Sequence, residues 1–238
     1  MNVLDLNKLS LYWEMVNAEK IALLNLLSDI KPVVSIEIGS KEGGSLQLIS
    51  QLSHTVYSLD IDPSVKNLGK KFSNVDFIIG DSKDTLPVLL NDLHDKNQQP
   101  DFILIDGDHS AEGVKRDIEN ILQLKITKPL VILMHDSFNP TCRRGMLDVD
   151  YTISNHVEKI EIDFVQGVFS PSATTKGEMW GGFGLIHLNP DTNNNNPRIE
   201  QSNAYSYNNT LLLSKHYHST QSSFLGRVKS YFFRKLTT

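Results

Sequence analysis

The chain has 238 residues, enough for one full-size domain and a short appendage. Its hydrophobic fraction of 39% and charged fraction of 21% are ordinary for a globular protein. No run approaches the roughly 20 apolar residues that a membrane span needs. The single cysteine, Cys142, excludes an internal disulfide and argues against a zinc cluster. Because the N-terminus also lacks the pattern of a secretory signal, we expect a cytoplasmic protein.

The formal net charge of −5 is unevenly distributed along the chain. From residue 198 onward there are six basic residues and one acid, so this tail carries +5 and the preceding residues carry −10. An acidic main domain argues against nucleic acid as a partner, because the phosphate backbone would be repelled.

The first predicted elements surround a glycine-rich turn. Apolar residues recur at helical spacing over residues 9–30, which predicts one or two amphipathic helices packed on a sheet. Residues 33–38 predict a buried strand, and helical spacing resumes at Ser45 after three glycines. Glycine allows a ligand to approach the backbone closely, and the next helix offers free N–H groups to an anion. The glycines do not match G-x-G-x-x-G, so an ordinary turn remains an alternative.

Four further strands and three helices follow in alternation. The strands are predicted at residues 54–62, 75–80, 101–105 and 130–134, and the helices at 63–71, 85–93 and 111–124. Asp60 ends the second strand about twenty residues after the glycine turn, where nucleotide folds place an acid that accepts hydrogen bonds from ribose. Asp62 precedes Pro63 and is the alternative candidate, although it also suits a helix cap.

Polar side chains end the next three strands as well. Asp81 and Ser82 follow the third strand, where they suit either the ligand-binding edge of the sheet or a helix cap. The last two strands end in groups that can bind metal or move protons: Asp106, Asp108, His109, His135 and Asp136. Such a concentration on two neighbouring strand ends favours a chemical site.

The remaining residues predict two late strands and a basic tail. Residues 140–149 are predicted as a loop whose arginines either attract an anionic acceptor or are solvated, and residues 151–156 as helical. Residues 160–169 and 180–188 predict strands, which indicates a mostly parallel sheet with an antiparallel edge. Residues 190–209 are rich in asparagine and predict a linker.

Residues 224–236 form a basic amphipathic pattern, typical of a helix that contacts an anionic membrane or a partner, or packs on its own domain. We therefore divide the chain into N-terminal helices (1–30), a main domain (31–190) and a linker with a C-terminal helix (191–238). The pattern is also compatible with a homodimer formed through the N-terminal helices or the tail.

The glycine turn, EIGSKEGGS at residues 37–45, has the form E-x-G-x-x-x-G-x-S. It resembles the first motif of class I S-adenosylmethionine-dependent methyltransferases, and the resemblance covers about residues 33–188. It implies an α/β fold with a Rossmann-like, doubly wound, mostly parallel seven-stranded sheet. It implies that the cofactor's methionine part is bound by Glu37, Gly39, Ser40, Gly43 and Ser45. Asp60 matches the ribose-binding acid, and Asp81 and Ser82 match positions beside the adenine.

The segments DGDHSAEGVKRDIE (106–119) and HDSFNP (135–140) are similar to small-molecule O-methyltransferases of the sugar and natural-product group, near the catechol branch. This resemblance implies a Mg²⁺ or other divalent cation held by Asp106, His135 and Asp136, with His109 as the base. His135 departs from the pattern, because Mg²⁺ prefers oxygen ligands. In a metal-free site, Asp106 would bind the cofactor's amino group and a histidine would act as the base.

We therefore expect an enzyme that methylates a hydroxyl of a small molecule such as a sugar, a natural product or a phenol. His109 and Asp106 are the expected catalytic residues, and residues 140–149 and 165–180 the expected walls of the acceptor pocket. One alternative is a nicotinamide-dependent oxidoreductase, which the missing G-x-G-x-x-G disfavours. The other is a non-catalytic binding module, which the complete set of acids and imidazoles disfavours.

Overall fold

Short runs of aliphatic and β-branched residues form the five strands of the parallel half of the sheet. The computed structural model describes residues 9–170 and 172–217. These strands are β1 (Val34–Ile38), β2 (Thr55–Asp60), β3 (Val75–Ile79), β4 (Phe102–Ile105) and β5 (Leu130–His135). They pair in parallel in the order β5-β4-β1-β2-β3. All carboxyl ends of the five strands therefore lie along one edge, where ligands bind in open α/β sheets.

Three later strands complete an eight-stranded sheet of order β10-β6-β9-β5-β4-β1-β2-β3. They are β6 (Val157–Val165), β9 (Phe183–Leu188) and β10 (Ile199–Glu200). The mostly parallel, doubly wound architecture confirms the prediction. The predicted seven strands and antiparallel edge need correction, because β9 is antiparallel but lies between β5 and β6. The additional strand, β10, pairs in parallel with β6 at the edge.

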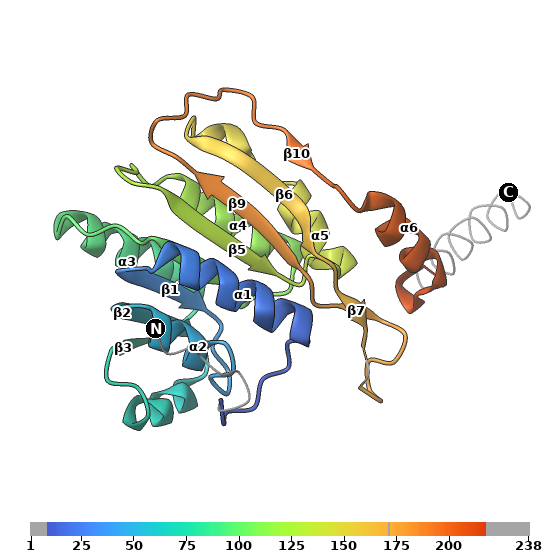
Figure 1. Ribbon diagram of the computed structural model, residues 1–238, viewed down its shortest axis with the longest axis horizontal. Helices are drawn as coiled ribbons and strands as arrows, with labels where there is room; N and C mark the ends of the chain where they lie inside the picture. Colours follow the sequence, from blue (N-terminus) through green and yellow to red (C-terminus); the bar gives the residue numbers. More distant parts are fainter. Residues whose placement is uncertain (1–8, 171, 218–238) are drawn as a thin grey trace, which may run out of the picture.

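Helices cover both faces of the sheet (Figure 1). α1 (Asn17–Ile30) and α2 (Leu46–Leu52) pack on one face, and α3 (Ser82–Asp95), α4 (Ala111–Leu122) and α5 (Pro140–Leu147) pack on the other. Side chains alternate between the faces along each strand, as the pleat requires. In β4, Ile103 and Ile105 join the cluster under α3–α5, whereas Phe102 and Leu104 join the cluster under α1 and α2.

The smaller elements correct several sequence predictions. The helix predicted from residue 9 begins only at α1, and residues 9–16 precede it without helical structure. The segment after β2 is the 3₁₀ helix η2 (Pro63–Lys70), and η3 (Tyr151–Ile153) is a single 3₁₀ turn. Each of the two predicted late strands is two strands in the structure. Residues 160–169 contain the end of β6 and β7 (Val168–Phe169), and residues 180–188 contain the end of β8 (Met179–Trp180) and β9. β7 and β8 pair with each other as a separate two-stranded sheet.

Most of the predicted loop at residues 140–149 is the helix α5, Pro140–Leu147. Pro140 occupies the first turn, and the Asn139 side chain caps the helix by accepting the N–H groups of Thr141 at 2.9 Å and Cys142 at 3.4 Å. The predicted linker at residues 190–209 likewise contains β10 and the start of α6 (Ala204–Leu213). The predicted helix at 224–236 lies outside the described residues.

Arg143 is a structural residue, which excludes it as the predicted solvated or anion-attracting side chain. Its guanidinium is buried, lies 2.7 Å from Asp163 and donates to Gln201 at 2.9 Å. It also stacks 4.0 Å above the ring of Tyr207 on α6. These contacts hold α5, β6 and α6 together. Within the described part of the chain, no helix has the length and apolar character needed to cross a membrane.

Candidate active site

The carboxyl ends of β1 to β5 open into one cleft of about 910 Å³. Gly39, Asp60 and His109, which follow three different strands, all line it. The other predicted site residues that line the cleft are Ser40, Ser45, Asp81, Ser82, Asp106, His135 and Asp136. Glu37 and Gly43 are absent from its lining. The parallel topology thus brings together most of the predicted site.

The glycine turn is built against the end of β4. Gly39 has φ of +85°, and a Cβ at this position would lie 2.1 Å from the carbonyl oxygen of Asp106. Only glycine satisfies both the left-handed backbone and the close approach. The turn is thereby fixed beside the strand end that carries Asp106.

Asp60 holds the same turn from the side of β2. Its Oδ2 accepts the backbone N–H groups of Ser40 and Lys41, both at 2.9 Å, and its Oδ1 accepts the N–H of Asp62 at 2.8 Å. Asp62 caps η2 by accepting the N–H of Ser64 at 2.8 Å, the role weighed for it from the sequence. Asp60 lines the cleft, and its Oδ1, which accepts one N–H, retains a lone pair for a further donor.

Glu37 supports the turn from beneath. Its carboxyl is fully buried and accepts hydrogen bonds from the hydroxyls of Ser40 and Ser45. Burial raises the pKa of Glu37 to about 7, although both serine hydroxyls oppose the shift. Glu37 does not line the cleft, so it can act on a ligand there only through these two serines, rather than by the predicted direct contact with a cofactor.

Asp81 and Ser82 combine a position on the cleft with structural hydrogen bonds. Asp81 caps α3 by accepting the N–H of Lys83 at 2.9 Å. The Ser82 hydroxyl donates to the buried carboxyl of Asp117 on α4, at 2.9 and 3.0 Å. Burial raises the pKa of Asp117 to about 6. Asp117 lies within the segment 106–119 but was not among the predicted site residues.

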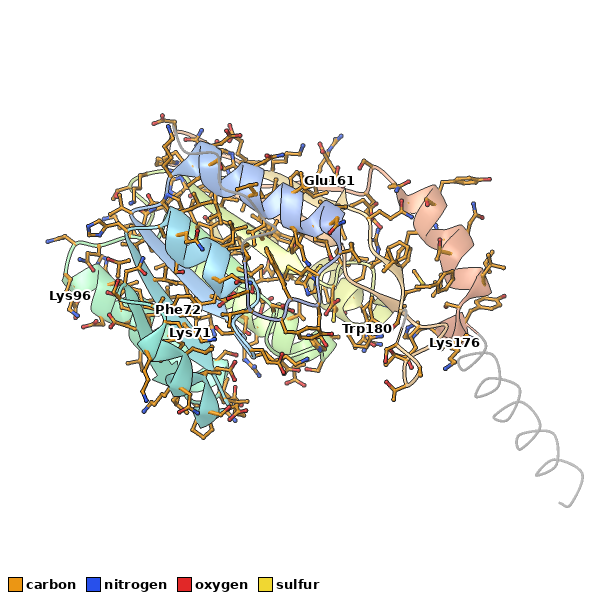
Figure 2. The ribbon with its side chains drawn as sticks, turned by 60° about the horizontal axis from the view of Figure 1, so that its bottom comes forward. Lys71, Phe72, Lys96, Glu161, Lys176 and Trp180 are labelled. Atoms are coloured by element: carbon orange, nitrogen blue, oxygen red, sulfur yellow. The ribbon has the colours of Figure 1, made fainter. Side chains whose placement is uncertain are left out.

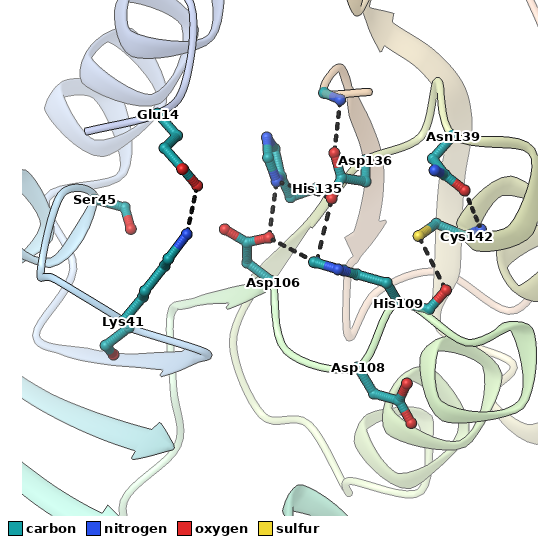
Figure 3. A network of polar contacts seen from close by, with 12 residues as sticks. Glu14, Lys41, Ser45, Asp106, Asp108, His109, His135, Asp136, Asn139 and Cys142 are labelled. Carbon is teal, nitrogen blue, oxygen red and sulfur yellow. Dashed lines mark hydrogen bonds and ion pairs between the residues drawn. The ribbon is translucent and has the colours of Figure 1, made fainter. Parts of the chain in front are cut away.

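His135 is held between two carboxylates. Its Nδ1 lies 2.8 Å from Asp106 Oδ1 and its Nε2 lies 3.0 Å from Glu19 Oε1, the first of which is drawn in Figure 3. Burial alone would lower the pKa of His135, but the charges of Asp106 and Asp136 and both hydrogen bonds raise it well above the usual value. Both ring nitrogens of His135 therefore face carboxylate oxygens, an environment that favours the charged form of the ring.

His109 lies at the cleft surface opposite Asp136. Its Nε2 is 3.3 Å from Asp136 Oδ2 and 3.7 Å from Asp106 Oδ1 (Figure 3), and its side chain is 47% exposed. The nearby carboxylate of Asp106 raises the pKa of His109; burial opposes this shift, and the charge of Asp136 adds to it. The ring meets Trp180 edge-on, with 5.5 Å between centroids. An imidazole in this setting can accept a proton, because two carboxylates stabilise the charged form.

The ligand atoms that could share a cation belong to Asp106, His109 and Asp136, which lie within 4.8 Å of one another. This differs from the predicted set of Asp106, His135 and Asp136. Both ring nitrogens of His135 face carboxylates, so His109 replaces it as the available imidazole. Two carboxylates and an imidazole suit a divalent cation of intermediate softness.

Sequence reasoning did not identify Glu19 as part of this centre or specify residues 12–16 as a cleft wall. Glu19 lies within an amphipathic helix, and no local pattern separates it from surface acids. The expected acceptor wall at 165–180 contributes Val168, Ser170, Ser172, Thr174, Thr175 and Trp180. Lys176 and Trp180 mark this segment in Figure 2. The other expected wall, 140–149, lies outside the cleft lining.

Comparisons with known proteins bear on the type of domain and on the fold. Residues 36–137 match a family model described as a methyltransferase domain. No curated protein sequence gives a significant match.

Among solved structures, the cofactor-bound protein Rv0187 from MTB is 18% identical, with a TM-score of 0.52 over 79% of this chain and 87% of that one. The O-methyltransferase from Bacillus cereus in complex with SAH is 14% identical, with a TM-score of 0.52 over 77% and 85%. The O-methyltransferase TomG from Streptomyces achromogenes, in complex with SAM, is 12% identical, with a TM-score of 0.50 over 74% and 81%. At these identities the likeness concerns the fold.

Proposed function

We propose that the chain, whose residues 36–137 match a methyltransferase domain, is a class I S-adenosylmethionine-dependent enzyme that methylates a hydroxyl of a small molecule. The observation that carries the proposal is the convergence of the glycine turn, Asp60 and the Asp106–His109–Asp136 group in a single cleft. The match to a methyltransferase domain disfavours the nicotinamide-dependent alternative.

The proposed cofactor contacts follow the strand ends. The turn around Gly39, Ser40 and Ser45 receives the methionine part, Asp60 the ribose, and Asp81 and Ser82 the adenine side. In support, exposed Ile61 follows Asp60 on the cleft and offers an apolar surface to a flat base. Glu37 and Gly43 shape the turn from outside the cleft.

The chemistry requires alignment and removal of one proton. Bound S-adenosylmethionine would supply an activated methyl group to the acceptor oxygen, and His109 would take the hydroxyl proton. Asp136 and Asp106 stabilise the imidazolium that forms, since both lie within 4 Å of Nε2. Alignment can lower the barrier by up to about 7–11 kcal/mol, and a positioned base contributes roughly 10²–10⁴-fold.

Asp106, Asp136 and His109 would also hold a divalent cation, which lowers the pKa of a bound hydroxyl and orients it. His109 Nε2 is the atom that faces both carboxylates, so the same nitrogen cannot bind a cation and receive the proton. We propose His109 as the base, and metal dependence is the competing arrangement of the same residues.

The acceptor is proposed to be uncharged and rich in hydroxyl groups. Nine carboxyl groups line the cleft, against one lysine and two histidines, so an anionic acceptor would be repelled. The wall from residue 168 to 180 presents serine and threonine hydroxyls beside Trp180. A sugar or a polyhydroxylated natural product matches this wall better than a phosphorylated or carboxylated molecule.

We also propose a cytoplasmic location, supported by the single, buried thiol of Cys142. We propose that nucleic acid is not a partner, because the main domain is acidic. We retain the three-part division at residues 30 and 190 and contact of residues 224–236 with a membrane or partner as proposals. Homodimerisation is a further proposal and can be measured by sedimentation of the full chain.

The proposal is tested by replacing His109 with alanine and measuring turnover on a panel of sugars, polyols and phenols. We expect turnover to fall roughly 10²–10⁴-fold, with the dissociation constant for S-adenosylhomocysteine within about threefold of wild type. His187→Ala is the matched control, because His187 pairs with Glu158 outside the cleft.

Equal loss of turnover and cofactor affinity in His109→Ala would remove the base assignment. Loss of wild-type activity on chelation would favour the cation-binding arrangement. Cofactor binding with no methylation of any acceptor would favour a non-catalytic binding module, and binding of NAD instead would reject the methyltransferase.

A further inference from the structure

Residues 12–16, here called the N-terminal wall, line the cleft just before α1 begins. Leu11, the residue before this wall, is tied to the first turn of α2, which directly follows the glycine turn. The Leu11 N–H donates to Gln47 Oε1 at 3.0 Å, and Gln47 Nε2 donates back to the Leu11 carbonyl at 3.2 Å. Gly44 is also in close contact, since a Cβ there would lie 2.7 Å from the Tyr12 carbonyl oxygen.

The other end of the wall is tied to the reaction centre by Glu19, whose side chain is almost completely buried. Glu19 Oε2 accepts the N–H of Val16 at 2.6 Å. Glu19 Oε1 accepts the N–H of Gly182 at 2.6 Å and the Nε2–H of His135 at 3.0 Å. One carboxylate therefore joins the wall, the end of β5 and the turn that leads into β9.

Through these two bonds Glu19 acts on both carboxylates of the proposed centre. His135 donates its other nitrogen to Asp106 at 2.8 Å. Gly181, next to Gly182, donates its N–H to Asp136 Oδ1 at 2.6 Å. The turn is also shaped around Glu19, because a Cβ on Gly181 would lie 2.8 Å from Glu19 Oε1.

A buried carboxylate is costly unless its oxygens are satisfied. Packing α1 on the sheet requires only apolar side chains, as Leu23 and Leu27 on the same helix supply. The three donors around Glu19 belong instead to the wall and to the strand ends. The bond with Val16 also caps α1, whereas the bonds with Gly182 and His135 reach the strand ends and serve the cleft.

We infer that Glu19 is a positioning residue that couples the N-terminal wall to Asp106 and Asp136. Through its hydrogen bonds, the position of the wall and the orientation of the two carboxylates depend on each other. The inference rests on the proposed function, because it assumes that these carboxylates act in methyl transfer.

The test compares Glu19→Gln with Asp29→Asn, a matched control that removes an exposed carboxylate from the other end of α1. Hydrogen exchange is measured by NMR on the cofactor-free full chain. In Glu19→Gln we expect the Val16 and Gly182 amides to exchange at least tenfold faster, with α4 amides unchanged. Asp29→Asn should match wild type at all of these positions.

The kinetic arm separates positioning from simple packing. Glu19→Gln should lower kcat at least tenfold while the KM for the acceptor changes by less than threefold, and Glu19→Asp should restore part of kcat. Unchanged exchange at Val16 and Gly182, or unchanged kcat with altered exchange, would overturn the coupling. Faster exchange that extends equally to α4 would also overturn it, as a global loss of stability.

The exchange arm requires no acceptor. Failure to find methylation by the wild-type chain would therefore count against the proposed function, whereas unaltered exchange in Glu19→Gln would count against the role of Glu19.

Discussion

Glu37 carries an ionisable group in a place from which water is excluded. Its carboxyl has no exposed surface, and the only donors that the structure records for it are the hydroxyls of Ser40 and Ser45. Burial therefore raises its pKa from 4.5 to about 7. The protonation state of one residue beneath the glycine turn becomes linked to the folding of the whole domain.

This linkage predicts a pH-dependent difference between wild type and Glu37→Gln. Between pH 4.5 and about 7 the folded protein keeps a proton that the unfolded chain releases, so the free energy of unfolding falls as pH rises. The full shift corresponds to roughly 3 kcal/mol. Urea denaturation at pH 5 and pH 8 should show this loss in wild type and not in Glu37→Gln. Stability curves that stay parallel between the two proteins would contradict the raised pKa.

Replacing single residues also tests whether a divalent cation binds in the cleft. If a divalent ion binds Asp106, His109 and Asp136, then Asp136→Asn should weaken binding of Mn²⁺ at least tenfold in calorimetry. Glu158→Gln is the matched control, because Glu158 pairs with His187 away from the cleft. Mn²⁺ binding that is absent from wild type, or equal in both variants, would leave Asp136 as the partner of His109 alone.

Among the elements, the glycine turn has the strictest geometry. Gly39→Ala places a Cβ 2.1 Å from the Asp106 carbonyl oxygen at a positive φ. We expect the free energy of unfolding to fall by about 1–3 kcal/mol and cofactor affinity to fall at least tenfold, because the β4 end must shift. Gly69→Ala is the control, since its Cβ would meet only the Phe77 ring at an ordinary 3.8 Å. Equal stability and affinity in both variants would show that the turn tolerates a side chain.

Sequence patterns predicted well the elements whose structure is determined by neighbouring residues in the chain. Runs such as Phe102–Ile105 bury both faces, and acids such as Asp62 and Asp81 cap the helices that follow them. α5 was missed because Asn139 and Pro140 suit a turn as well as a helix start. β10 has two residues and exists only because β6 offers it an edge.

The residues of the candidate site likewise fall into those that the sequence predicts and those that depend on tertiary packing. Strand ends bring Asp60, Asp106 and Asp136 to one edge because parallel topology demands it, so their meeting was predictable. Glu19 and Asp117 meet the site through tertiary packing of helices, for which the sequence has no periodic signal. The exchange of His135 for His109 as the available imidazole likewise depends on Glu19, which occupies the second nitrogen of His135.

At the scale of the whole molecule, the ion pair of Arg143 and Asp163 joins α5, β6 and α6. Removing one member of a buried pair leaves the other charge uncompensated, so Arg143→Met should lower the free energy of unfolding by about 3–5 kcal/mol. Arg144→Met removes the same charge from an exposed neighbour and should change it by less than about 0.5 kcal/mol. Chemical denaturation compares the two. Similar values for both would mean that the tertiary pair contributes no more than a surface charge.

The position of β9 between β5 and β6 determines when this sheet can close during synthesis. β6 emerges from the ribosome before β9 yet has no strand of the parallel half to pair with, and β5 keeps an open edge until Phe183–Leu188 arrives. Nascent chains that stall before residue 183 should therefore expose two unpaired, apolar strand edges, the configuration that recruits chaperones and seeds aggregation. Insertion of β9 joins β6 to the parallel half of the sheet, and β10 and α6 are added after it.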